Sequence, residues 1–305
     1  MREMGNSVVE APELSIVAPV RRAEATVGAT LAALLEQCRS LPVEVIAAVA
    51  EDDPSRAVLE RQNAPGLRVI VVPGRQGIPQ LRREGVWQAR APWVVITEDH
   101  CLFPPEWVRN FLESAGTGER KVCGGPVLNG VPSLAGWVLY FSRYSAFLPP
   151  VAEGPVRTLP GTGACYPRDL LLEHSALLRE GFWEAELNEA LARRNVIFWM
   201  SPDLAVKQHQ RRGLLEFIAL RFRHGRCYGA RRMAAARSRA WMGLLLRAPL
   251  APFALLARSA WAVFRKRRYR RRFFLASPLL FLCFCSWAGG EAVGYLLGGH
   301  SMETD

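Results

Sequence analysis

Short runs of apolar, β-branched residues recur along the first hundred positions and predict buried β-strands. The four runs span residues 14–20, 43–49, 67–72 and 93–96. Apolar residues at helical spacing lie between them and predict helices over residues 26–38, 56–62 and 78–91. Strands and helices that alternate at this spacing build right-handed units around a parallel sheet. The pattern therefore predicts an α/β fold with a mostly parallel central sheet flanked by helices.

Polar and ionisable residues follow each predicted strand. They are Arg21 and Arg22, the run 51–53, Gly74 and Arg75, and the run 98–100. Ligands of open parallel sheets bind outside the carboxyl ends of the strands, so we expect these side chains to converge at one edge. The chain has neither a GxGxxG run after its first strand nor a P-loop, so neither phosphate-binding device is supported. If a nucleotide binds, carboxylates that hold Mg²⁺ or Mn²⁺ are the obvious means of fixing its phosphates.

Charge is divided unevenly along the chain. Residues 1–204 carry 20 Lys and Arg against 24 Asp and Glu, residues 205–272 carry 19 against one, and residues 273–305 carry none against three. A mildly acidic body is followed by a strongly basic segment and an apolar tail, which is typical of a soluble domain anchored at a membrane. The hydrophobic share of 50% excludes a mainly disordered chain.

The apolar C-terminal part divides into two segments. Residues 241–264 are interrupted by arginines and prolines, so we expect an interfacial or re-entrant helix. Residues 273–298 carry one charged residue, Glu291, and a helix of that length reaches about 39 Å, enough for a tilted transmembrane span. The basic run 265–272 beside it predicts that this end faces the cytoplasm. Glu291 is then a candidate pairing or functional residue, or marks the interfacial end of the helix.

Cysteine usage and the N-terminus bear on the compartment. The seven cysteines form no CxxC pair or Cys/His cluster, so we expect reduced thiols rather than disulfides or zinc. The first thirty residues carry no apolar run behind a basic start, so we expect no signal peptide. We expect no nucleic-acid partner either, because apolar stretches follow the basic segment and favour a membrane.

Several blocks between residues 13 and 230 resemble the family 2 glycosyltransferases of the GT-A fold. SIVAPVRR and AAVAEDDPS resemble the family's first two strands and the turns that contact the nucleotide. IPQLRREGVWQARAPWVVITEDHCLFPPEW resembles a helix with an arginine, a strand and the D-x-D metal motif. GTGACYPRDLL resembles the acceptor-side block, GFWEAELNEALARR the block that usually holds the catalytic base, and SPDLAVKQH a late strand whose histidine can contact the metal.

The resemblance implies roles for individual residues. The nucleotide sugar would be bound by Pro19, Arg21, Asp52, Asp53, Arg82, Glu98 and Asp99. A divalent metal, Mn²⁺ or Mg²⁺, would be bound by Asp99, His100 and His209. The catalytic base would be Glu184 or Glu186, although both also suit a solvated helix N-terminus.

One departure from the family concerns the metal motif. The run Glu98-Asp99-His100 stands where the family has D-x-D. Carboxylate and imidazole both bind Mn²⁺, so the main ligand could be Asp99 or His100.

These expectations define an organisation and a function. The segments are an N-terminal tail (1–12), a GT-A domain (13–212), a basic helical segment (213–240), membrane-associated helices (241–298) and a tail (299–305). We expect inverting, metal-dependent transfer of a sugar from a nucleotide-diphosphate sugar to a lipid-linked or cell-surface glycan acceptor, by a cytoplasmic domain at the inner or plasma membrane. The Q-x-x-R-W motif of processive members is absent. Two alternatives remain open: a nucleotidyl- or phosphosugar-transferring GT-A enzyme, and an inactive membrane-anchored nucleotide-sugar-binding protein.

Overall fold

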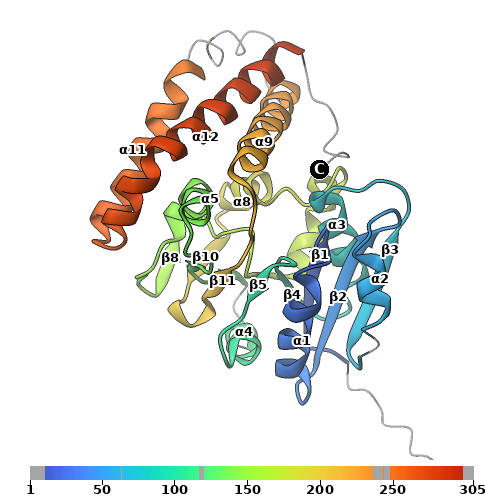
Figure 1. Ribbon diagram of the computed structural model, residues 1–305. Coiled ribbons are helices and arrows are strands. Elements are labelled where there is room, and N and C mark those ends of the chain that lie inside the picture. The colour runs from blue at the N-terminus through green and yellow to red at the C-terminus, as the bar shows by residue number, and fades with distance from the viewer. Residues whose placement is uncertain (1–10, 63, 117–119, 236–242, 244–247, 298–305) are drawn as a thin grey trace, which may run out of the picture.

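The computed structural model describes residues 11–62, 64–116, 120–235, 243 and 248–297. Its centre is an eight-stranded sheet with the order β3-β2-β1-β4-β9-β6-β10-β8 (Figure 1). The first four strands in that order are parallel, with bounds Leu67–Val72, Val43–Ala50, Leu14–Val20 and Trp93–Ile96. The four strands predicted from the sequence, and the mostly parallel sheet, are therefore confirmed.

The second half of the sheet mixes strand directions. Its strands are β9 (Ala164–Pro167), β6 (Lys121–Gly124), β10 (Ile197–Met200) and β8 (Gly154–Val156). Strand β9 is antiparallel to both β4 and β6, whereas β6 and β10 are parallel. A second sheet has the order β5-β11-β7, with bounds Cys101–Leu102, Val206–Gln208 and Val127–Asn129. Strand β5 follows β4 closely, so the small sheet lies directly beyond the carboxyl end of β4.

Helices cover both faces of the large sheet because the strand residues alternate between two cores. Along β1, Leu14 and Ile16 pack on one core with Trp107 and Phe111 of α4 (Trp107–Gly116), whereas Val17 packs on the other. The first core also contains α1 (Val27–Cys38) and α2 (Arg56–Glu60). The second contains α3 (Ile78–Gln88), α6 (Arg168–Glu173), α7 (Ser175–Leu178) and α8 (Glu184–Ala192).

A separate helical layer lies beyond one end of the sheet (Figure 1). It consists of α5 (Leu134–Tyr144), α9 (Leu214–Ala235), α11 (Ala251–Arg265) and α12 (Arg270–Leu297). Short 3-10 turns span Ser145–Phe147, Pro202–Leu204 and Ala248–Leu250. The apolar segment expected over 241–264 is described from residue 248 on, and the tail helix begins at residue 270, inside the basic run. Among the described helices, α12 alone is long and apolar enough to cross a membrane.

Glycines set how closely α9 and α12 pack. A Cβ atom at Gly225 or Gly229 of α9 would meet the backbone of α12, and one at Gly290 or Gly294 of α12 would meet the backbone of α9. Each helix thus presents a Gly-x-x-x-Gly stripe to the other, which is the arrangement that lets two helix backbones approach most closely. Glu291 lies beside this contact and pairs with Arg232 at 3.1 Å, so the carboxylate within the apolar helix has a partner.

Candidate active site

The run Glu98-Asp99-His100 lies just beyond β4, where the two sheets meet. The N–H of Thr97 still bonds to Val17 of β1 at 2.9 Å, so the chain leaves the large sheet only after residue 97. All three side chains of the run are buried. Three ionisable groups buried together at the carboxyl end of a parallel strand make this edge the candidate ligand site.

Glu98 is held by cationic and hydroxyl donors from two helices. Arg82 of α3 donates to it at 3.0 Å, and Arg143 at the end of α5 donates at 3.3 Å. The Tyr144 hydroxyl donates to its other oxygen at 3.3 Å. Burial alone would raise the pKa of Glu98, but Arg143, the His100 hydrogen bond and Arg82 together hold it well below its ordinary range. Glu98 is therefore an ionised carboxylate that organises two arginines.

His100 lies between the two carboxylates of its own run. Its Nδ1 is 2.7 Å from Asp99 Oδ1, and its Nε2 is 3.1 Å from Glu98 Oε2. Burial alone would lower the pKa of His100, but the contacts with Asp99 and Glu98 raise it to about 9. The backbone N–H of His209, at the end of β11, bonds to the His100 carbonyl at 2.9 Å. The late histidine thus lies beside the run, and its Nδ1 is buried without a hydrogen bond.

This arrangement does not form a metal centre. Across the described ranges, no three His, Cys, Asp or Glu side chains converge closely enough to hold an ion. The reason is local, because the carboxylates of Glu98 and Asp99 enclose the imidazole of His100 and a backbone N–H instead. The predicted ligands Asp99, His100 and His209 are neighbours, but their donor atoms do not fit Mn²⁺ or Mg²⁺ as they lie here.

The turns after β1 and β2 bring further predicted residues to this edge. The N–H of Arg21 bonds to Asp99 at 2.9 Å, and the Arg21 side chain donates to the Gln76 carbonyl. Asp53 is buried and accepts from the N–H of Arg22 at 2.9 Å. Asp53 therefore shapes the turn that carries Arg21.

Two predicted nucleotide-site residues differ in their surroundings. Asp52 is exposed and lies 3.4 Å from Arg75, in the loop after β3. Pro19 is a buried residue of β1 that lies opposite Ala48 in the sheet. It therefore helps to fix where the backbone of β1 ends at this edge.

The two candidate bases point in different directions from the start of α8. Glu184 pairs with Arg82 at 2.6 Å, and its side chain is 37% exposed. Glu186 pairs with Arg231 of α9 at 2.6 Å through both oxygens. A glycine at position 161 makes room for Glu184, because a Cβ there would lie 2.5 Å from its Oε1. Arg82 thus connects Glu184 to Glu98, while Glu186 faces the helical layer.

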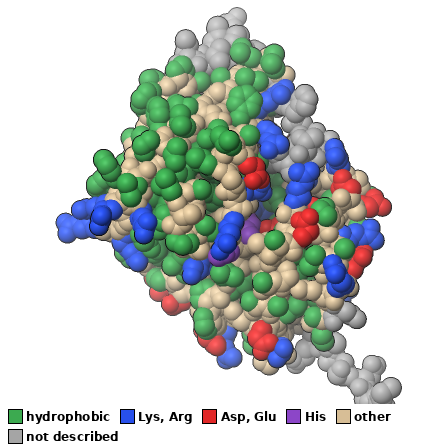
Figure 2. All heavy atoms as spheres, viewed as in Figure 1, with side chains coloured by type: hydrophobic (Ala, Val, Ile, Leu, Met, Phe, Trp, Pro, Cys, Tyr) green, Lys and Arg blue, Asp and Glu red, His purple; other side chains and the backbone are tan. Residues whose placement is uncertain are grey.

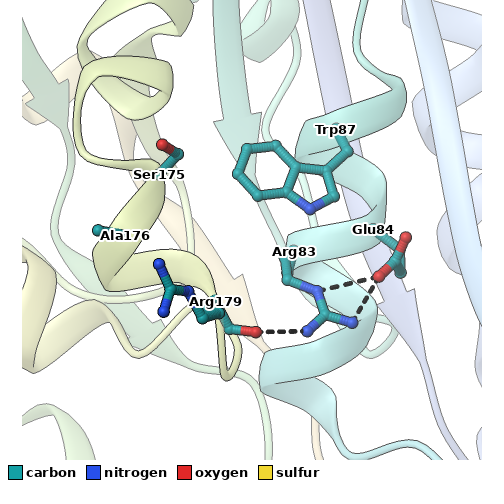
Figure 3. Close-up of a pocket in the computed structure, with 6 residues that line it drawn as sticks. All are labelled: Arg83, Glu84, Trp87, Ser175, Ala176 and Arg179. Carbon is teal, nitrogen blue, oxygen red and sulfur yellow. Dashed lines mark hydrogen bonds and ion pairs between the residues drawn. The ribbon is translucent and has the colours of Figure 1, made fainter.

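Sequence reasoning missed Arg143 and Tyr144, which reach Glu98 from α5. The string WVLYFSRY predicts a buried apolar helix, and one arginine at its end gives no hint of a distant partner. A hollow of about 360 Å³ lies elsewhere, between α3 and α7 (Figure 3). Arg83 crosses it to the Arg179 carbonyl at 2.8 Å. None of its lining residues belongs to the run 98–100, so we assign the chemistry to the sheet edge.

Comparison with known proteins bears on the family and the fold of the chain. Residues 15–174 match the family model described as glycosyl transferase family 2. No match was found among curated proteins. A mannosyltransferase from Pyrobaculum calidifontis, solved with GDP-Man and Mn²⁺, superposes with a TM-score of 0.57 at 16% identity, covering 94% of this chain and 88% of that one. S. aureus TarS with UDP-GlcNAc gives 0.50 at 15% identity, covering 95% and 93%. At such identities the two structures establish the fold.

Proposed function

Because this chain belongs to glycosyl transferase family 2, we propose that it transfers a sugar from a nucleotide-diphosphate donor with Glu184 as the catalytic base. One observation carries the proposal: Arg82 contacts Glu98 at 3.0 Å and Glu184 at 2.6 Å. A single buried guanidinium thereby joins the donor edge of the sheet to a partly exposed carboxylate. Such a carboxylate is suited to take the proton of an acceptor hydroxyl.

The cations of the site serve the departing diphosphate. Negative charge develops on that group as the sugar leaves, and fixed cations stabilise it without rearranging. Arg82 and Arg143 flank one side of the edge, and Arg21 approaches from the turn after β1. Inversion follows if Glu184 and the diphosphate act on opposite faces of the sugar.

Metal dependence remains a prediction that comes from the resemblance. The mannosyltransferase with the same fold was solved with Mn²⁺, whereas Glu98, Asp99 and His100 here contact one another. Turnover measured with EDTA and then with added Mn²⁺ tests it. Loss of turnover with EDTA and its recovery with Mn²⁺ would confirm the metal. Unchanged turnover would mean that the arginines alone stabilise the charge of the departing diphosphate.

We also propose that the helical layer contacts a membrane, which gives access to a lipid-linked acceptor. Large apolar side chains are exposed on α11 and α12, including Phe253 and Trp261 at 61% and Phe274 at 76%. Figure 2 shows apolar side chains gathered over the helical layer, with basic side chains at its lower left margin. Apolar surface next to basic charge suits an anionic bilayer surface.

An interfacial contact suits this layer better than the transmembrane span predicted over 273–298. The second half of α12 is accompanied by α9, because Ser286 bonds to Ile218 and Arg232 pairs with Glu291. A full span would carry the α9 arginines into hydrocarbon, which is costly. The cytoplasmic placement of the catalytic domain stays a prediction.

A turnover assay with base variants tests the proposed function. Detergent-solubilised protein is incubated with UDP-, GDP- and dTDP-sugars and acceptor lipid extract, and the released nucleotide is identified. We expect a nucleoside diphosphate, loss of release in Glu184→Gln and near-normal release in the matched control Glu186→Gln. Loss of release in Glu186→Gln together with near-normal release in Glu184→Gln would identify Glu186 as the base. Release of a monophosphate or pyrophosphate would favour the phosphosugar or nucleotidyl alternative, and tight nucleotide binding without release would favour the inactive one.

A further inference from the structure

A group of basic side chains lies between α5 and α9, beside the Glu98 carboxylate. Arg143 ends α5, whereas Arg221 and His224 are three residues apart on α9 and so share a helix face. Arg212 lies just before the start of α9, and its Nε is buried without a hydrogen bond. Figure 2 shows histidine and basic side chains near the centre of one face of the molecule, at the border of the apolar surface. We call Arg143, Arg221 and His224 the α5–α9 cluster.

The positive charge of the α5–α9 cluster is poorly compensated. Arg143 shares the Glu98 carboxylate with Arg82. No carboxylate of the described chain pairs with Arg221, whose Nε is buried without a hydrogen bond and whose guanidinium lies 6.0 Å from the Trp287 ring centroid. Burial and Arg143 lower the pKa of Arg221 to about 10. A buried arginine whose charge is opposed both by burial and by a neighbouring arginine, and whose Nε has no hydrogen bond, indicates that an anion belongs beside it.

His224 contributes a neutral imidazole to the same place. Burial lowers its pKa, and Arg221, Arg143 and Arg212 lower it further, to about 3. A neutral imidazole beside guanidinium groups offers one N–H donor without adding a charge. Guanidinium forks match the oxygens of phosphate, with which they form paired, charge-assisted hydrogen bonds. The donors of the cluster therefore suit a phosphate group better than an uncharged sugar.

The position of the cluster indicates what carries that phosphate. Phe141 of α5, Phe217 of α9 and Phe284 of α12 pack in one core, so the cluster lies where the helical layer meets the sheet edge. Arg143 touches Glu98 of the donor edge at 3.3 Å. Exposed apolar side chains lie on α11 and α12, and Trp287 of α12 lies beside Arg221. A molecule with both a phosphate and a long apolar chain has a group for each of these two surfaces.

We propose that Arg143, Arg221 and His224 bind the phosphate group of a lipid phosphate, which is the acceptor or carries it. The inference rests on the proposed function, because it places this lipid next to the donor edge. It goes beyond that function by assigning a subsite to residues of α5 and α9. The same chemistry could bind free phosphate or the donor diphosphate, and the experiment distinguishes these sources.

Calorimetric titration of the full chain in detergent tests the proposal. The probes are farnesyl phosphate, farnesol, inorganic phosphate and UDP or GDP, added to wild type, Arg221→Gln, Arg221→Lys and Arg258→Gln. Arg258 is an exposed arginine of α11 and serves as the matched control. We expect Arg221→Gln to weaken farnesyl phosphate binding at least tenfold, Arg221→Lys to recover part of it, and Arg258→Gln to change it less than twofold. Nucleotide affinity should stay unchanged in all variants.

Several outcomes overturn the proposal. Equal affinity for inorganic phosphate and farnesyl phosphate would assign the cluster to a free anion. A parallel loss of nucleotide affinity in Arg221→Gln would assign it to the donor diphosphate, and unchanged farnesyl phosphate binding would remove Arg221 from any site. If Arg221→Gln fails to fold, His224→Phe, which keeps an aromatic ring, must show the loss. Because no turnover is measured, an inactive protein could still bind the lipid, and an active one could fail to.

Discussion

The close packing of α9 on α12 makes a sharp prediction at two adjacent glycines. A Cβ at Gly290 would lie 2.8 Å from the carbonyl carbon of Phe222 and closer still to its oxygen. Both atoms are backbone, so the helices themselves must separate. A Cβ at Gly289 would meet only the edge of the Phe222 ring, at 3.8 Å, which is ordinary contact. The same substitution to alanine therefore has opposite consequences at neighbouring positions.

The magnitudes follow from two opposing effects. Replacing a helical glycine by alanine gains up to about 1 kcal/mol of helix propensity at either site. Overpacking costs about 1–3 kcal/mol, with backbone clashes at the upper end. Gly290→Ala should then lose about 1–2 kcal/mol of stability, while Gly289→Ala gains about 0.5–1 kcal/mol. At roughly 2–4 °C per kcal/mol, the melting temperatures of the two variants should differ by about 3–12 °C.

Thermal unfolding of the detergent-solubilised chain, followed by tryptophan fluorescence, measures this difference. Trp287 of α12 lies 5.3 Å from the Tyr228 ring of α9 and reports on the contact directly. A double change, Gly290→Ala with Phe222→Ala, controls for the side chain, since the clash is with backbone and should persist. A Gly290→Ala protein that melts at or above the wild-type temperature would refute the packing argument.

Three further predictions concern the site and the layer. Gly161→Ala would push Glu184 aside, so steady-state kinetics should show turnover reduced by about 10²-fold with little change in donor KM. Glu98→Gln should cost about 3 kcal/mol at pH 7 by urea unfolding, because it leaves buried arginines short of a partner. Since the pKa of Glu98 is lowered by folding, the difference in unfolding free energy between wild type and Glu98→Gln should persist down to about pH 4.3 and become smaller below it. Trp261→Ser should weaken binding to anionic vesicles about tenfold in flotation assays, because it removes an exposed aromatic side chain.

Local pattern was enough to predict the parallel half of the fold. Strands β1, β2 and β4 are buried along all or nearly all of their length, whereas β3 at the edge of the sheet is mostly half-buried. The β-branched runs that predict these four strands need no distant information. The antiparallel strands β8 and β9 are three and four residues long and gain their place from neighbours. Their short sequences therefore gave no prediction, since pairing and not propensity fixes them.

Most residues of the candidate site could be named from the sequence, but the ion pairs that they form could not. Glu184 and Glu186 are two residues apart on a helix and so point to different sides. Only the tertiary position of Arg82 and Arg231 decides which of them faces the sheet edge. Likewise the run Glu98-Asp99-His100 was visible in the sequence, whereas the contacts that hold Glu98 beside His100 depend on Arg143 and Tyr144 of α5.

Helix α9 is the element through which the layer and the site act on each other. Its glycines contact α12, and its residues Arg221 and His224 lie near Arg143 at the end of α5. Its Arg231 pairs with Glu186, two residues from the proposed base. A shift of α9 against α12 must therefore move either the α5–α9 cluster or the start of α8. A variant such as Gly290→Ala, placed far from the sheet edge, should consequently lower turnover more than it lowers nucleotide affinity, because donor binding depends on the strand ends and not on α9. Equal losses in both would mean that the layer supports the whole domain instead of positioning the acceptor side.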